Sequence, residues 1–70
     1  MPLSMGSEGV PYVIQRIGGK EETRRFLENL GFVTGAEVMV ISMIDGNIII
    51  NIKDSRVAIG KTMANKIMVA

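Results

Sequence analysis

The stretch 21–41 shows the clearest change of hydrophobic spacing in the chain, and it predicts a helix followed by a tight turn and a strand. Phe26, Leu27 and Leu30 fall on one helical face, while charged and amide side chains cover the other directions. Gly31 follows the last of these apolar residues, at the position where a helix usually ends with a left-handed residue. We therefore expect a helix that ends near Leu30 and turns Phe26 and Leu30 toward the core.

Short aliphatic runs outside this helix predict strands, because β-branched side chains favour extended backbone. The expected strands are residues 10–17, 37–43, 48–53, 56–60 and 67–69. A helical turn at 61–66 is expected before the last strand, with Met63 and Ala64 facing inward. Alternation in the third strand separates an inward row from an outward row, namely Ile48, Ile50 and Ile52 against Ile49, Asn51 and Lys53.

Proline and glycine mark the boundaries between these elements. Pro11 lacks a backbone donor, which places the start of the first strand at a sheet edge or a bulge. Asp45-Gly46 predicts the hairpin between the second and third strands, with Asn47 as a possible third loop residue. Leu3 and Met5 precede a glycine-rich loop, and we expect both to anchor the N-terminus against the sheet.

Five short strands in one chain of 70 residues favour a small barrel that closes its own sheet edges. The position of the helices chooses among barrels. An OB-fold usually places its helix between the third and fourth strands, whereas here the main helix lies between the first and second. A helical turn before the last strand is typical of SH3-like barrels. We therefore predict one mainly β domain over residues 1–70, a five-stranded SH3-like barrel with one main helix.

Composition narrows the possible chemistry. Ten isoleucines and seven valines against three aromatic residues suit an aliphatic core. For the methionines we favour core filling over an adaptable binding surface, specifically at Met39, Met43, Met63 and Met68. Cysteine and histidine are absent, which removes the usual transition-metal ligands and the usual proton-transfer group. No serine or threonine has a matching base by pattern, so we expect no enzyme activity and no cofactor.

Charge and hydropathy bear on partners and location. A net charge of +1 is too near neutral for the electrostatic attraction that nucleic-acid binding usually requires, and Tyr12 is the one candidate for an exposed stacking aromatic. Residues 1–5 contain no basic segment and no long apolar run, so we predict neither a signal peptide nor a membrane span. A fold without cysteine suits a cytoplasmic location.

Two separated motifs combine glycine with aliphatic residues at fixed positions. The first consists of Leu30, Gly31, Phe32, Gly35, Val38 and Val40, and the second of Arg56, Ala58, Ile59, Ala64, Ile67 and Val69. Together and in this order they resemble the FeoA family, small cytoplasmic proteins associated with bacterial ferrous iron uptake. The resemblance runs from Leu3 to Val69. Thr34 stands where that family often has proline, which softens the turn without changing the fold.

The resemblance implies a non-enzymatic accessory protein that contacts the membrane ferrous iron transporter, which has a GTP-binding cytoplasmic region. A monomer that neither inserts into the membrane nor binds nucleic acid is expected. The alternative is an SH3-like regulatory module related to the C-terminal domain of metal-responsive transcriptional repressors. That alternative predicts a winged-helix domain upstream, and Met1 at the start of a compact domain argues against it.

The expected partner-binding residues are Arg24, Arg25, Ile49 and Arg56. Solvated charges beside neighbouring glutamates would also explain any one of the arginines. Ile49 is either covered by the helix or the N-terminal segment, or lies in an apolar patch that meets the partner. The carboxylates are scattered, and Glu21 and Glu22 diverge on a helix, so we predict no specific metal site.

Overall fold

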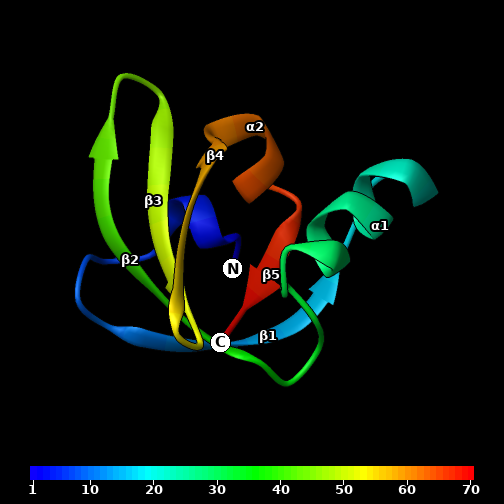
Figure 1. The fold of residues 1–70 in the computed structure, drawn as a ribbon, viewed down its shortest axis with the longest axis horizontal. Coiled ribbons are helices and arrows are strands. Elements are labelled where there is room, and N and C mark those ends of the chain that lie inside the picture. Colours follow the sequence, from blue (N-terminus) through cyan, green and yellow to red (C-terminus); the bar gives the residue numbers. More distant parts are fainter.

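The computed structural model describes residues 1–70, which form a curled five-stranded antiparallel sheet with a helix beside it (Figure 1). The strand order is β4-β3-β2-β1-β5. The strands are β1 (Pro11–Ile17), β2 (Glu37–Ile44), β3 (Asn47–Ile52), β4 (Ser55–Gly60) and β5 (Ile67–Val69). The helices are a 3₁₀ turn η1 (Leu3–Met5), the main helix α1 (Glu21–Asn29) and a single turn α2 (Lys61–Ala64). The predicted order of the five strands, the main helix and the helical turn before the last strand is confirmed, while η1 was not predicted.

The core lies inside the curl of the sheet, and β3 contributes most regularly to it. Its alternate residues Ile48, Ile50 and Ile52 are buried, as the period of two predicted. The other buried apolar residues come from every remaining helix and strand and from the turn after α1: Leu3, Ile14, Leu27, Phe32, Val38, Val40, Ile59, Ala64, Ile67 and Val69. Aliphatic packing of this kind is the main source of stability in a domain without disulfides.

β1 changes partner along its length. Its first half pairs with β2, from Pro11 opposite Met39 onward, and its second half pairs with β5. A register shift between Ile14 and Arg16 marks the change. Such an irregularity interrupts the strict alternation of faces, so Ile17 packs against the same core as Ile14 despite the odd spacing.

The β2–β3 hairpin has a two-residue loop. Asp45 and Gly46 have φ angles of 48° and 81°, the left-handed values that a type I′ turn requires at both positions. Ile44 and Asn47 face each other directly across the end of the ladder. Asn47 therefore belongs to β3 and does not widen the loop.

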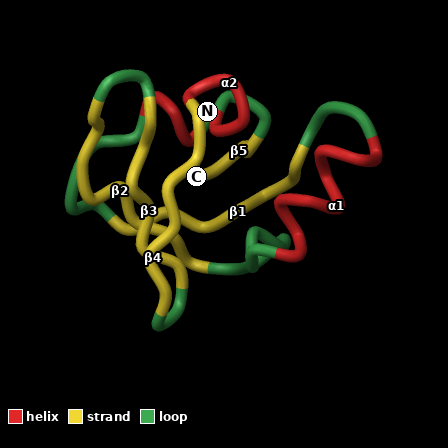
Figure 2. The backbone as a smooth tube through the Cα atoms, turned by 45° about the horizontal axis from the view of Figure 1, so that its top comes forward, coloured by secondary structure: helices red, strands yellow, loops and turns green.

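α1 lies beside the sheet and does not plug the mouth of the barrel. Both views show it near β1, with its N-terminal half standing clear of the strands (Figures 1 and 2). Leu27 is fully buried and Leu30 packs on the core, but Phe26 is 49% exposed. The expectation that Phe26 faces inward was wrong, because only the last turn of the helix meets the sheet.

Two methionine predictions also need correction. Met5 is 72% exposed, so of the two expected anchors only Leu3 packs in the core. Met43 is 47% exposed near the end of the β2–β3 hairpin, where the core no longer covers it. Met39 and Met68 are half-buried, and Met63 packs against the core as expected. Methionine therefore fills the core at some of these positions and not at others.

The two ends of the sheet differ. β4 and β5 are not neighbours in the ladder, so the sheet curls without closing into a continuous cylinder. The outer edge of β5 is covered by the N-terminal residues: Pro2 bridges Met68, and the Val69 N–H donates to the Met1 carbonyl at 2.8 Å. β4 has no partner on its outer side.

Candidate functional site

The outward face of β2, β3 and β4 brings together residues that are far apart in the sequence. One row across this face runs from Met39 through Asn51 to Arg56, which are successive cross-strand partners. The next row contains Ile49 between Ser42 and Ala58. Residues on one face of neighbouring strands lie close enough for their side chains to interact.

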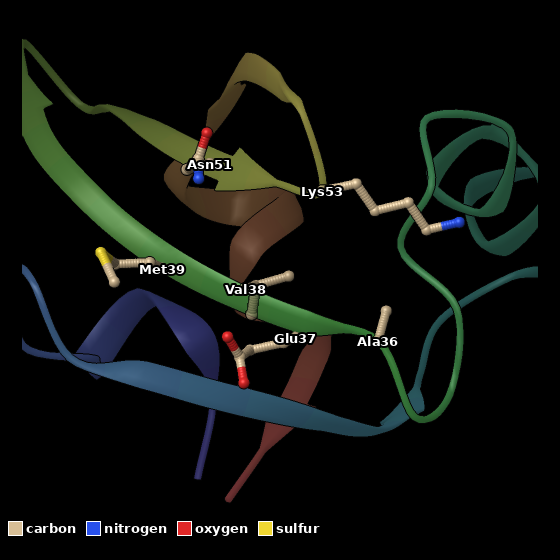
Figure 3. Close-up of a pocket in the computed structure, with 6 residues that line it drawn as sticks. All are labelled: Ala36, Glu37, Val38, Met39, Asn51 and Lys53. Carbon is tan, nitrogen blue, oxygen red and sulfur yellow. The ribbon is translucent and has the colours of Figure 1, made fainter.

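A shallow hollow of about 190 Å³ opens on this face. It is lined by Ala36, Glu37, Val38, Met39, Asn51 and Lys53. Figure 3 shows Lys53 extending toward the segment that follows α1, with the Glu37 carboxylate directed away from it toward β1. The hollow therefore combines an apolar floor with a cation and an anion on different sides.

Ile49 and Arg56 share the outward face. Arg56 lies opposite Asn51, two residues along β3 from Ile49, so the two are diagonal neighbours. Arg56 is exposed and Ile49 is half-buried. This pair of the sequence-predicted residues is thus brought together beside the hollow, because Asn51 belongs both to its lining and to the Arg56 row.

Arg24 and Arg25 lie on a different element, the exposed part of α1. The Arg25 guanidinium donates to the Glu21 carboxylate at 2.8 Å, and both side chains are mostly exposed. Arg24 is also exposed and forms no ion pair. The structure therefore divides the four predicted residues into a strand pair, Ile49 and Arg56, and a helix pair, Arg24 and Arg25.

Sequence reasoning missed the hollow itself. Asn51 and Lys53 were expected to face outward, but Met39 was assigned to the core. Its position beside Asn51 follows from the β2–β3 register, which includes a shift between Val40 and Ser42. Alternation within one strand gives the face of a residue and does not give its cross-strand neighbour.

Other features of the site concern ions and membranes. Among the acidic residues, no three lie close enough together to hold a metal ion. The prediction that the chain has no metal site stays a prediction. Tyr12 is half-buried against the core, and its hydroxyl accepts a hydrogen bond from the Ser7 N–H at 2.9 Å. No helix has the length and apolar character needed to cross a bilayer.

Comparison with known proteins covers the whole chain. The FeoA domain family matches residues 1–70. "Putative Fe(2+) transport protein A" of Methanocaldococcus jannaschii is 34% identical over 68 residues, which is 97% of this chain and 83% of that protein. A crystal structure of an iron uptake regulatory protein, FeoA, superposes with a TM-score of 0.91 at 33% identity, covering 99% of this chain and 93% of the other.

More distant structures share the fold. FeoA of Stenotrophomonas maltophilia, described as an SH3 domain protein and crystallised with zinc, has a TM-score of 0.87 at 22% identity over all of this chain and 89% of its own. A manganese-dependent transcriptional repressor has a TM-score of 0.91 at 20% identity, with this chain spanning 35% of it. The predicted SH3-like fold is confirmed. On the full-length family match and the 34% identity to the archaeal protein, the chain belongs to the FeoA family.

Proposed function

We propose that this protein is a non-enzymatic accessory component of ferrous iron uptake, acting in the cytoplasm by contact with the membrane ferrous iron transporter. The observation that carries the proposal is the family match over residues 1–70, together with the relative named as an Fe(2+) transport protein. The contact is with the transporter's GTP-binding cytoplasmic region, and the protein acts as a monomer. The iron is the transporter's cargo, and this chain does not hold it.

Two surfaces could form that contact. The strand pair Ile49 and Arg56 supplies an aliphatic and a cationic side chain beside an open hollow. The helix pair Arg24 and Arg25 supplies charge on an element that stands away from the sheet. Apolar contact surrounded by charge is the usual composition of a protein interface, and it favours the strand pair as its centre.

A second candidate is an SH3-like regulatory module of the kind found in metal-dependent repressors. Its support is the shared fold with a manganese-dependent repressor, at 20% identity. A likeness of fold does not carry a function with it. The relative at 34% identity is named for Fe(2+) transport, and we therefore favour the transporter contact.

The deciding experiment is a binding titration of the whole protein against the full-length transporter in lipid nanodiscs. We expect binding at concentrations below roughly 50 µM, the range of weak and transient contacts. Ile49→Asp and Arg56→Glu should each weaken it by at least about fivefold, because each places a wrong charge in the contact.

A matched control is Arg16→Glu, which makes the same change of charge on β1, three strands away from β4. It should leave the affinity within about twofold if the contact is local. Charge reversal at Arg24 and Arg25 together tests the helix pair separately. Absence of binding for the unmodified protein would contradict the proposed function.

A further inference from the structure

The outer edge of β4 presents backbone groups that no other part of the protein uses. In an antiparallel ladder, alternate residues direct both N–H and C=O toward the partner strand, and the residues between them direct both away. The Lys61 N–H donates to the Gly46 carbonyl at 2.9 Å, which continues the β3–β4 register and fixes this alternation. Arg56 and Ala58 are therefore residues whose N–H and C=O point away from β3.

These groups have no hydrogen-bond partner elsewhere. Neither Arg56 nor Ala58 takes part in any backbone bond outside the regular ladder or in any side-chain bond, and β4 pairs with β3 alone. Both residues are exposed, while Val57 between them packs against the core and Ile59 after them is buried. The edge thus offers two donors and two acceptors to solvent, in the spacing of an extended strand.

At the opposite end of the sheet, the backbone groups of the outer strand are hydrogen-bonded by another part of the same chain. There the Val69 N–H and carbonyl are both taken by Met1, and Pro2 bridges Met68. The N-terminal segment therefore occupies the β5 edge as an added piece of extended chain. At the β4 edge the fold supplies no such segment.

The charges along β4 indicate what kind of strand could pair with its outer edge. The segment 53–61 contains three basic residues and one acidic residue, and none of the basic ones forms an ion pair. Pairing with a second copy in the register that sets Arg56 against Ala58 would bring Lys53 beside Lys61 of the other copy. Like charges directly opposite are destabilising. An acidic strand would instead place its carboxylates beside these cations.

We propose that β4 accepts an extended, acidic segment of a partner protein as a sixth strand, held by the backbone groups of Arg56 and Ala58. Backbone bonds supply most of the affinity in this mode of recognition, and side chains next to the added strand supply the preference. Arg56 lies on the same outward face as Ile49 and Asn51, and β4 would stand between the added strand and the hollow. The transporter as the source of that segment rests on the proposed function; the acceptor edge itself does not.

The test uses a blocked ten-residue peptide of alternating glutamate and threonine, titrated into the whole protein. Binding should protect the Arg56 and Ala58 amides from hydrogen exchange. Ala58→Pro removes an outward donor at an edge position where proline is tolerated, and it should weaken binding at least about tenfold. Ala58→Val keeps the donor and should bind like the unmodified protein. Arg56→Glu should weaken binding about tenfold, and 0.5 M salt should reduce the difference.

A second arm keeps the test valid if Ala58→Pro does not fold. The same peptide with every backbone amide N-methylated retains its charge and loses its donors on both edges, so it should no longer bind the unmodified protein. Equal binding of the methylated peptide, unprotected Arg56 and Ala58 amides, or equal binding of a lysine-for-glutamate peptide would each overturn the proposal. Protection that rises with protein concentration alone, together with dimers in sedimentation, would overturn it in favour of self-pairing.

The transporter in nanodiscs separates this proposal from the proposed function. If it binds and protects the two amides, both are supported. If it binds without protecting them, the sixth strand is contradicted and the proposed function stands. If the acidic peptide binds and the transporter does not, the acceptor edge is supported and the proposed partner is contradicted.

Discussion

Phe32 donates its backbone N–H to the carbonyl of Leu27 across 3.0 Å, and both side chains are completely buried. Gly31 donates in parallel to the Glu28 carbonyl at 2.9 Å, with a φ of 108°. These two bonds form a Schellman motif, which ends a helix and satisfies its last carbonyls. The motif also sets two core side chains on either side of the turn, so the end of α1 and the start of the following segment are fixed together.

Gly31→Ala should destabilise the protein by about 1–2 kcal/mol, because a side chain disfavours the positive φ of this position. Space is not the obstacle, since an added Cβ would lie 3.5 Å from the Ile52 Cδ1 atom, an ordinary contact. Thermal unfolding should shift down by roughly 5–15 °C. Gly60→Ala is the control: its φ is −66° and an added Cβ would lie 4.0 Å from the Asn47 Oδ1 atom, so the melting temperature should stay within a few degrees.

Leu27→Ala and Phe26→Ala should differ sharply although the residues are adjacent. Leu27 is fully buried, and its truncation should cost about 2–5 kcal/mol, enough to unfold a marginal small domain. Phe26 is about half exposed, so Phe26→Ala should cost less than about 1 kcal/mol. Urea unfolding followed by circular dichroism measures both. Equal losses would mean that more of α1 packs on the sheet than its last turn.

The Glu21–Arg25 ion pair should contribute little. Both side chains are largely exposed, at 63% and 72%. Exposed pairs at this helical spacing are worth about 0.3–0.5 kcal/mol and weaken with salt. A double-mutant cycle of Glu21→Ala and Arg25→Ala should therefore give a coupling below about 0.5 kcal/mol at low salt and near zero in 1 M salt. A coupling that persists in high salt would contradict this account.

Leu3→Ala should destabilise the domain by about 2–5 kcal/mol, because Leu3 is completely buried in the core. Its loss should also loosen the N-terminal residues that cover the β5 edge, so the Val69 amide should exchange hydrogen faster. Met5→Ala, two residues further on, is the matched control and should have almost no effect on either measurement.

Periodicity was sufficient for most of the fold. The inward row Ile48, Ile50 and Ile52 could be predicted because one buried face leaves only one acceptable alternation. The left-handed residue after α1 could be predicted from Gly31 and its apolar neighbours. Phe26 could not be placed, because helical spacing shows which side of a helix is apolar and not how much of that side meets another element.

The candidate surface was harder to predict from the sequence than the core. Ile49 and Arg56 become diagonal neighbours only through the β3–β4 register, which a two-residue turn at 53–54 sets. That turn holds Lys53 at a φ of 52°, although lysine is not a residue that favours positive φ. The register shift between Ile14 and Arg16 in β1 likewise could not be predicted, because no glycine or proline lies at that point of the sequence. Such features depend on the packing of the whole sheet.

The pairing of Ile14 with Val69 has a consequence for how the chain comes to its native state. The two residues are 55 positions apart, so β1 gains its second partner only when the chain as far as residue 69 is available. Pairings this remote slow the search for the native topology, and milliseconds to seconds is the expected range. During synthesis on the ribosome, Ile14 would stay uncovered until residue 69 emerges. Formation of β5 is therefore the step that completes the pairing of β1.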